Sequence, residues 1–289
     1  MPYNSSPLQF HRVLLGNRQQ LPSCSLRPIL NPLHRDAKTS SKLLLIGWAM
    51  LILIPASLYI FSVTMFPRIE LDTHFAQLLY WITSTGTAPY GIATGIVILI
   101  ACYRSLAKPQ FLQLVLAVSI SMAATLSLNH FLKPFFAEAR PYAALLAQES
   151  LLNTDDFYQH NKKNKRAMIS TAVEQLEVAR NDINLSSAIK GHWQHEVGYS
   201  FPSGHTLFAV TLALVVSFYL LLAGQTLLPT ALFSWAIAMG FSRMWLGMHW
   251  PQDVLASTVI GGIIALSSIA VIQTLLIRVN RVQKLSANE

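Results

Sequence analysis

Long runs of uncharged, mainly apolar residues alternate along the chain with shorter polar stretches. The run from Leu43 to Pro67 has twenty-five residues without a formal charge. A helix of that length, rising about 1.5 Å per residue, crosses a hydrocarbon core of about 30 Å. Comparable runs predict transmembrane helices at Ala88–Tyr103, Pro109–Leu132 and Val254–Ile277.

The longest uncharged run predicts two further helices. It extends for forty-six residues from Val197 to Ser242, and Gly224-Gln225 and Pro229 interrupt it. A tight turn at these residues divides the run into a fourth and a fifth transmembrane helix. Just before Ala88, the segment Phe75–Thr85 is predicted to be an amphipathic or interfacial helix. The pattern therefore predicts six transmembrane helices.

One region differs from the rest in its charge. Between Lys133 and Glu196, ends included, there are eight basic and eight acidic residues. Ser170–Arg180 is compatible with a helix, and Asn161–Asn164 is typical of a turn. We expect residues 134–200 to form an aqueous loop large enough for a small helical cap between helices 3 and 4.

Composition agrees with a membrane protein. Hydrophobic residues make up 53% of the 289 residues, charged residues only 12%, and the mean hydropathy is +0.43. That is too little charge to coat a soluble globule of this size. The expected fold class is an all-α integral membrane protein. Cys24 lies in the polar tail and Cys102 at the end of an apolar run, so the two support neither a disulfide framework nor a metal-thiolate site.

The net charge of +8 is explained by topology rather than by nucleic-acid binding. Six spans place both termini on one side, which holds 11 of the 21 Lys and Arg residues but only two acidic residues. The other side has ten basic and eleven acidic residues. The positive-inside rule therefore predicts cytoplasmic termini and an outward-facing 134–200 loop.

These features predict three parts of the chain. Residues 1–41 are expected to be a flexible, basic cytoplasmic tail, and residues 42–277 the six-span membrane domain with its loop. Residues 278–289 are the predicted cytoplasmic C-terminal tail.

Several ionisable and polar side chains fall at the same, outer edge of the predicted spans. They are Lys133, Arg140, Ser203, Gly204, His205, Arg243, His249 and Asp253. Such groups are costly at the edge of a membrane and are functional candidates by default. Three fixed cations beside two histidines suit a tetrahedral phosphate. The helix that starts after Ser203 adds unpaired backbone N–H groups, and Gly204 lets a ligand approach them closely.

The spacing of these residues carries a resemblance. Lys133 is followed after six residues by Arg140-Pro141, then by Pro202-Ser203-Gly204-His205, then by Ser242-Arg243, five residues, His249, three residues and Asp253. This order resembles the three-part signature of the type 2 phosphatidic acid phosphatase superfamily. The surrounding residues are similar to the bacterial phosphatidylglycerophosphatase branch of that superfamily: Asp156-Phe157-Tyr158, His192-Trp193-Gln194 and Leu246–Pro251. The basic tail before Lys42 departs from that branch.

The resemblance implies a mechanism without metal or cofactor. His249 attacks phosphorus and forms a phosphohistidine, and Asp253 holds its other ring nitrogen. His205 protonates the departing oxygen and later activates water. The implied phosphate-binding residues are Lys133, Arg140, Ser203, Gly204 and Arg243.

Each of these residues also has an ordinary structural interpretation. A basic residue at a span end is an anchor, Ser203 is a helix cap, and Asp253 a helix-start residue. For the histidines of the loop, His160, His192 and His195, solvated surface is the favoured interpretation, and a role in shaping the substrate entrance is the alternative. What favours catalysis is that order and spacing match one signature together.

The expected function is therefore a lipid phosphate phosphatase at the periplasmic face of a bacterial inner membrane. It would remove the terminal phosphate from phosphatidylglycerol phosphate, undecaprenyl diphosphate or related lipids, among which the sequence does not select. The expected partner is the lipid phosphate substrate, with no nucleic acid, and the oligomeric state stays open. A lipid phosphotransferase on the same site is one alternative, and a non-catalytic transporter or scaffold is another.

Overall fold

The computed structural model describes residues 36–67, 70–180 and 182–286, and the side chains of these residues up to Val279. In these ranges all regular elements are α-helices, apart from an isolated bridge between Leu71 and Leu185. The predicted N-terminal tail lies outside them up to residue 35, as do residues 287–289 of the predicted C-terminal tail.

Eleven helices are present in the described residues. Along the chain they are α1 (Ala37–Ile60), α2 (His74–Ser84), α3 (Tyr90–Ser105), α4 (Lys108–Phe136), α5 (Pro141–Gln148), α6 (Thr154–Gln159), α7 (Lys162–Ala179), α8 (Ser187–His195), α9 (Gly204–Leu222), α10 (Leu227–Trp245) and α11 (Pro251–Ser286).

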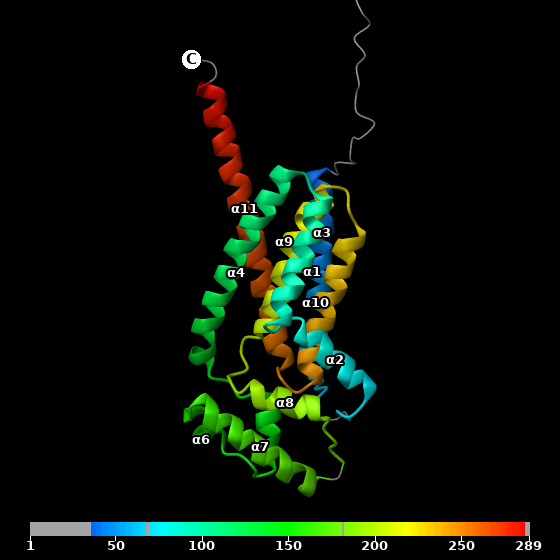
Figure 1. Cartoon of the computed structure of the whole chain (residues 1–289), viewed down its shortest axis with the longest axis vertical. Coiled ribbons are helices and arrows are strands. Elements are labelled where there is room, and N and C mark those ends of the chain that lie inside the picture. Colours follow the sequence, from blue (N-terminus) through cyan, green and yellow to red (C-terminus); the bar gives the residue numbers. More distant parts are fainter. Residues whose placement is uncertain (1–35, 68–69, 181, 287–289) are drawn as a thin grey trace, which may run out of the picture. The chain divides into compact units, whose positions relative to one another are not determined.

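Helix α9 is the centre of the bundle (Figure 1). It contacts α1, α4, α10 and α11. Nearly every residue from Thr206 to Leu221 is buried, because this helix is apolar on all sides and can be covered on all sides by its neighbours. The first turn of α9 is thereby fixed firmly at one end of the bundle.

The outer surface of the bundle is apolar. Large hydrophobic side chains are exposed on its outer helices, including Ile46 and Leu53 of α1, Val97 of α3, and Leu126 and Phe131 of α4. An exposed apolar surface of this extent is unfavourable in water but favourable in lipid. The backbone polar groups of a helix are satisfied by hydrogen bonds within the helix, as a lipid environment requires. Four segments are long and apolar enough to cross a membrane: Ala37–Ile60, Lys108–Gln148, Gly204–Leu222 and Pro251–Val279. The chain is a multi-pass membrane protein.

Each predicted span corresponds to a helix, with shifted ends. Helix α1 begins at Ala37 rather than Leu43, and α11 begins at Pro251 rather than Val254. The turn predicted at Gly224 separates α9 from α10, and Gly224 has a positive φ of 78°, which glycine adopts without strain. The segment predicted as interfacial is α2.

Helices α5 to α8, from Pro141 to His195, form a cap at the end of the bundle where α9 begins (Figure 1). Its core is separate from that of the bundle and includes Tyr142, Phe157, Ile169 and Trp193. The helical character predicted for the loop is confirmed. The turn predicted at Asn161–Asn164 is wrong: the Asn161 side chain accepts a hydrogen bond from the Asn164 N–H at 3.0 Å, so it caps α7, and the following lysines lie in the first helical turn.

Candidate active site

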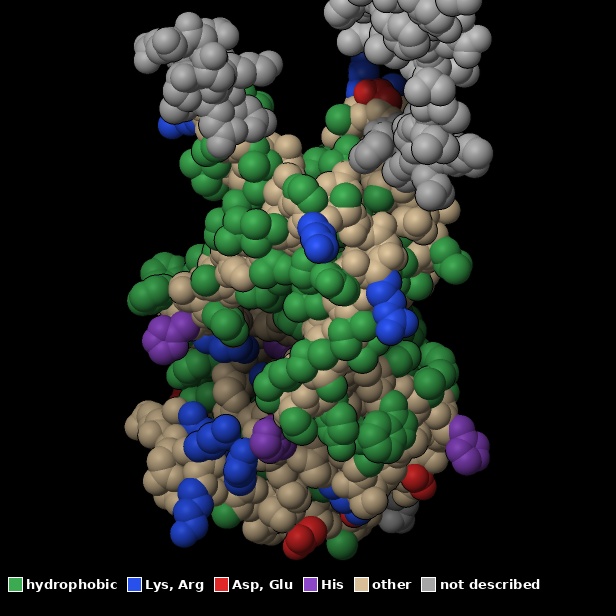
Figure 2. Space-filling view, turned by 45° about the horizontal axis from the view of Figure 1, so that its top comes forward, with side chains coloured by type: hydrophobic (Ala, Val, Ile, Leu, Met, Phe, Trp, Pro, Cys, Tyr) green, Lys and Arg blue, Asp and Glu red, His purple; other side chains and the backbone are tan. Residues whose placement is uncertain are grey.

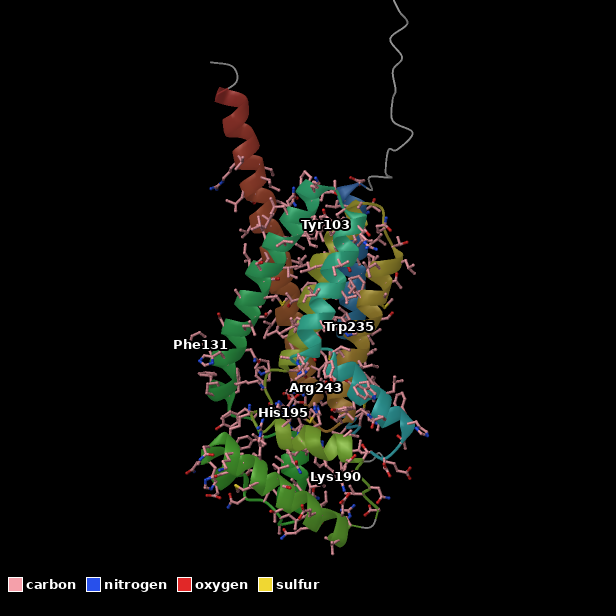
Figure 3. The ribbon with its side chains drawn as sticks, viewed as in Figure 1. Tyr103, Phe131, Lys190, His195, Trp235 and Arg243 are labelled. Carbon is pink, nitrogen blue, oxygen red and sulfur yellow. The ribbon has the colours of Figure 1, made fainter. Side chains whose placement is uncertain are left out.

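Arg243, in the last turn of α10, is the most deeply buried cation of the site (Figure 3). Its Nη1 donates to Oγ1 of Thr83 at 2.6 Å and to Nε2 of His192 at 2.9 Å. Its Nη2 donates to Oε2 of Glu196 at 2.6 Å. Helices α2 and α8 thus orient a guanidinium that reaches the site from α10.

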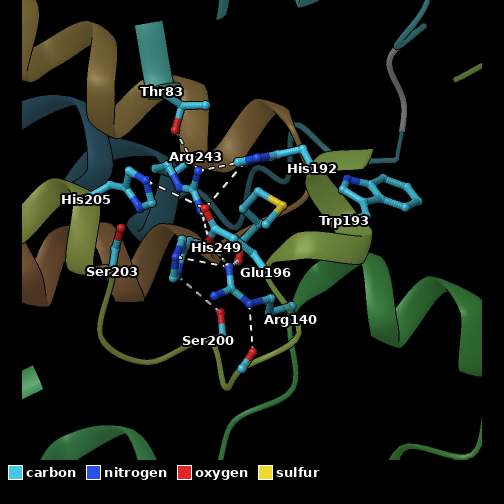
Figure 4. A network of polar contacts seen from close by, with 12 residues as sticks. Thr83, Arg140, His192, Trp193, Glu196, Ser200, Ser203, His205, Arg243 and His249 are labelled. Atoms are coloured by element: carbon cyan, nitrogen blue, oxygen red, sulfur yellow. Dashed lines mark hydrogen bonds and ion pairs between the residues drawn. The ribbon is translucent and has the colours of Figure 1, made fainter. Parts of the chain in front are cut away.

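Arg140, the residue before α5, approaches the same carboxylate. Its Nη1 lies 3.3 Å from Oε2 of Glu196. The backbone carbonyls of Gly198 and Met248 accept from its guanidinium at 2.8 and 3.1 Å. We call Arg140 and Arg243 the arginine pair. Both are buried, and their forks converge on one anionic group (Figure 4).

That anionic group belongs to Glu196, at the C-terminal end of α8. Burial opposes ionisation of this carboxyl, but Arg243, His205 and Arg140 together hold its pKa well below the usual range. Glu196 is therefore a carboxylate between two guanidinium groups. Two guanidinium groups that converge on one carboxylate form an arrangement suited to binding an oxyanion.

His249 faces the arginine pair from the turn between α10 and α11. Its Nδ1 lies 3.3 Å from Oδ2 of Asp253, and its Nε2 lies 3.4 Å from Nη1 of Arg140. A guanidinium can only donate, so Nε2 carries the lone pair and Nδ1 carries the proton. Burial, with the nearby Arg140, Arg243 and Lys133, holds the His249 pKa well below its usual value. The ring is neutral, with its free nitrogen directed at the cations.

Asp253 is held from three sides in the first turn of α11. Its Oδ2 accepts from the Trp250 backbone N–H at 3.0 Å, from the Ser200 hydroxyl and from Nδ1 of His249. Helix α11 starts at Pro251, which suits a first helical turn. Asp253 thus lies beside Nδ1 of His249, which is the contact that the sequence analysis expected.

His205 reaches the arginine pair from the first turn of α9. Its Nε2 lies 2.6 Å from Oγ1 of Thr87 and 3.6 Å from Oε1 of Glu196. The two histidines thus border the Glu196 carboxylate and the arginine pair, His205 from α9 and His249 from the turn before α11 (Figure 4).

The remaining predicted phosphate ligands lie around this centre. The Ser203 hydroxyl caps α9 and accepts from Thr206 N–H at 3.4 Å. Gly204 begins α9, and a Cβ there would lie 3.4 Å from the amide of Asn129. Lys133 donates from Nζ to the Tyr199 carbonyl at 2.7 Å, so it binds the loop before α9 rather than Glu196.

Sequence reasoning missed several residues of the site. The interpretation of His192 as solvated surface is wrong: it is 8% exposed and accepts from Arg243. Glu196 is, like the predicted cations, an ionisable residue at the edge of an uncharged run, and this position could have marked it as a site residue. In the sequence analysis it is included only among the charges of the loop. Thr83 and Thr87 carry no recognisable sequence signal. Within the described chain, no cluster of three His, Cys, Asp or Glu residues has the arrangement of a metal site.

Comparison with known proteins gives a family for this geometry. The PAP2 superfamily matches residues 114–277, a segment that contains all eight predicted site residues. Phosphatidylglycerophosphatase B of Escherichia coli (strain K12) is 30% identical over 219 residues, covering 74% of this chain and 82% of that protein. The phosphatidylglycerophosphatase B of Haemophilus influenzae is 33% identical over 196 residues, covering 64% and 77%.

A shorter similarity extends to another phosphatase. The undecaprenyl-diphosphatase of Bacillus subtilis (strain 168) is 39% identical over 70 residues, which cover 24% of this chain and 34% of that protein. The resemblance seen in the motifs is confirmed, and an alternative as a non-catalytic transporter or scaffold loses its support. The chain belongs to the PAP2 superfamily and is a phosphatase.

Proposed function

We propose that this protein hydrolyses the terminal phosphate of membrane lipid phosphates, through a phosphohistidine formed at His249. The observation that carries the proposal is the neutral His249 ring, whose free Nε2 is directed at the arginine pair where Glu196 now lies. Substrate phosphate takes the place of the carboxylate and comes within reach of that nitrogen.

The first half-reaction forms the intermediate. Nε2 of His249 bonds to phosphorus while the bond from phosphorus to the lipid oxygen breaks, and His205 gives that oxygen a proton. Asp253 stabilises the positive ring that results, because it accepts from Nδ1. The arginine pair neutralises charge that grows on the equatorial oxygens, and Lys133, Ser203 and the Gly204 N–H complete the phosphate site.

The second half-reaction releases phosphate. His205, now neutral, takes a proton from water, the water oxygen bonds to phosphorus, and the bond from phosphorus to Nε2 breaks. The substrates we propose are phosphatidylglycerol phosphate, undecaprenyl diphosphate and related lipid phosphates. The names of the relatives support this range, and the apolar bundle beside the site supports a lipid-bound substrate.

We further propose that α1, α3, α4, α9, α10 and α11 all cross a bacterial inner membrane. The cap and the site then face the periplasm, and residues 1–41 and 278–289 are cytoplasmic. Lys163, exposed on α7, tests this orientation. With Cys24 and Cys102 changed to Ser, Lys163→Cys is expected to react with a membrane-impermeant maleimide in cells whose outer membrane is permeable. Labelling that needs lysis of the inner membrane would refute the orientation.

The catalytic proposal is tested with purified protein in detergent, supplied with phosphatidylglycerol phosphate or an isoprenyl diphosphate and a chelator. We expect phosphate release by the wild type and a loss of at least a thousandfold for His249→Ala. His74→Ala, at an exposed position at the start of α2, is the matched control and keeps full activity. Turnover by His249→Ala would disprove the nucleophile, and a strict requirement for added divalent metal would disprove the metal-free mechanism.

A further inference from the structure

A cavity of about 470 Å³ opens from the catalytic centre toward the cap. Thr87 and His205 line it on the bundle side, and Glu196 with the two residues after it lines the middle. On the cap side it is lined by Lys162, Lys165 and His195. Its size is that of a small-molecule site. Figure 2 shows a recess between bundle and cap, with basic side chains near its rim.

The two lysines lie on one face of α7. They are three residues apart in its first turn and so project in the same direction. The Lys165 ammonium lies over the rings of Phe157, Tyr158 and Tyr199, 5.8, 5.4 and 6.0 Å from their centroids. These contacts hold its charge in place without neutralising it.

Neither lysine has an ion-pair partner among the described residues, whereas Lys190 of the same cap pairs with Glu177 at 2.6 Å. The one carboxylate that lines the cavity, Glu196, is bonded to the arginine pair. Nδ1 of His195 accepts from Arg166 at 3.1 Å, so its Nε2 carries the ring proton. The cap side of the cavity therefore has donors and positive charge that the protein itself does not neutralise.

The position of His205 indicates which part of the substrate would approach the positive charge on the cap side of the cavity. In the proposed reaction the scissile phosphate binds the arginine pair and His205 protonates the leaving oxygen, and His205 also lines the cavity. The first atoms of the leaving group therefore enter the cavity, toward Lys162, Lys165 and His195. A leaving group with an anion close to its reacting oxygen would bring that anion to the lysines.

We propose that Lys162, Lys165 and His195 form a second anion subsite, which binds a phosphoryl group carried by the leaving group. The inference rests on the proposed function and names its substrate class: lipids with a second phosphate near the scissile one. The α-phosphate of an isoprenyl diphosphate and the phosphodiester of phosphatidylglycerol phosphate share this chemistry. Lysine ammonium groups on flexible stems suit both, because they act as point charges and impose no fixed fork geometry.

The test compares substrates with one and with two phosphates. The variant Lys162→Gln/Lys165→Gln is assayed on phosphatidylglycerol phosphate, farnesyl diphosphate and phosphatidic acid. We expect kcat/KM to fall about tenfold or more on the first two and less than threefold on phosphatidic acid. A loss on only one of the two-phosphate substrates supports the subsite and identifies which phosphate it binds.

The matched control is Lys163→Gln, which is in the same turn of α7 and exposed like Lys162, but lies outside the cavity lining. It is expected to leave all three substrates unchanged. A second readout is inhibition: the double variant should raise the inhibition constant of pyrophosphate and leave that of inorganic phosphate unaltered.

Two results overturn the subsite. One is an equal loss on all three substrates, which indicates general attraction or a disturbed cap, and the other is no loss on any of them. Hydrolysis of none of the three lipids by the wild type would instead disprove the proposed function itself.

Discussion

Glu196→Gln is the most informative single change, because it removes the anion from the arginine pair and preserves the size of the side chain. The wild-type carboxylate bonds to Arg243 at 2.6 Å and lies 3.3 Å from Arg140. Its side chain is 13% exposed and that of Arg243 is fully buried. The variant leaves two guanidinium groups with a neutral amide between them.

Two opposite effects follow from this change. Removal of one partner of a buried ion pair costs about 3 to 5 kcal/mol, and the amide oxygen still accepts a hydrogen bond, so we expect a loss near 3 kcal/mol. For a chain of this size that lowers the melting temperature by roughly 5 °C. Phosphate, in contrast, no longer has to displace a carboxylate, and its affinity should rise by about tenfold or more.

The assay is thermal unfolding in detergent, followed by tryptophan fluorescence over a range of inorganic phosphate concentrations. We expect Glu196→Gln to melt lower than wild type without phosphate and to gain more stability as phosphate is added. Glu177→Gln, which breaks the Lys190 ion pair of the cap, is the control and should respond to phosphate like the wild type. A phosphate response of Glu196→Gln equal to or smaller than that of wild type would refute the conclusion that Glu196 occupies the phosphate position.

Three further predictions concern neighbouring groups. Asp253→Asn should reduce kcat on phosphatidic acid at least a hundredfold with little change in KM, because the amide no longer fixes the proton on Nδ1 of His249; an unchanged kcat would contradict this role. Burial lowers the pKa of His192 to about 3, so the folded state binds fewer protons than the unfolded one and stability falls as pH drops from about 6.5 toward 3. His192→Asn should flatten that fall in a melting-temperature series, whereas His160→Asn, at the cap surface, should not; equal slopes would count against buried His192 as the cause. Arg140→Lys should raise KM about tenfold, since a point charge cannot serve two carbonyls and a phosphate as the guanidinium does; an unaltered KM would show that the fork geometry is not needed.

The helices could be predicted from sequence because lipid imposes a simple rule on them. A span needs an uncharged run of sufficient length, and runs such as Leu43–Pro67 and Val254–Ile277 satisfy it without reference to any neighbour. Their ends were less certain, since α1 and α11 continue past the charged residues Lys42 and Arg278. Once a helix extends beyond the hydrocarbon region, charged residues no longer determine where it ends.

The proximity of some candidate site residues could be predicted for a different reason. Arg243, His249 and Asp253 are close in sequence, and a helix that starts at Pro251 makes their contact local. His192 could not be predicted in the same way, because its partner Arg243 is fifty-one residues away. Its amphipathic helix exposes one face and buries the other, and the charge of the surrounding segment gave no indication of which face carries His192.

The segment from Glu196 to Ser203 assembles this site more than any single helix does. The Glu196 side chain binds the arginine pair, the Gly198 carbonyl binds Arg140, and the Tyr199 carbonyl binds Lys133. Two of these three contacts use backbone oxygen, which every residue has, so no side-chain pattern in the sequence could mark them. The same segment lines the cavity beside His205, and it connects α8 to α9 without belonging to either helix. In the proposed reaction, we expect phosphate to replace the Glu196 carboxylate through a change in this connection. The buried guanidinium groups would then have an anionic partner before and after substrate binds, which avoids the cost of leaving them unpaired.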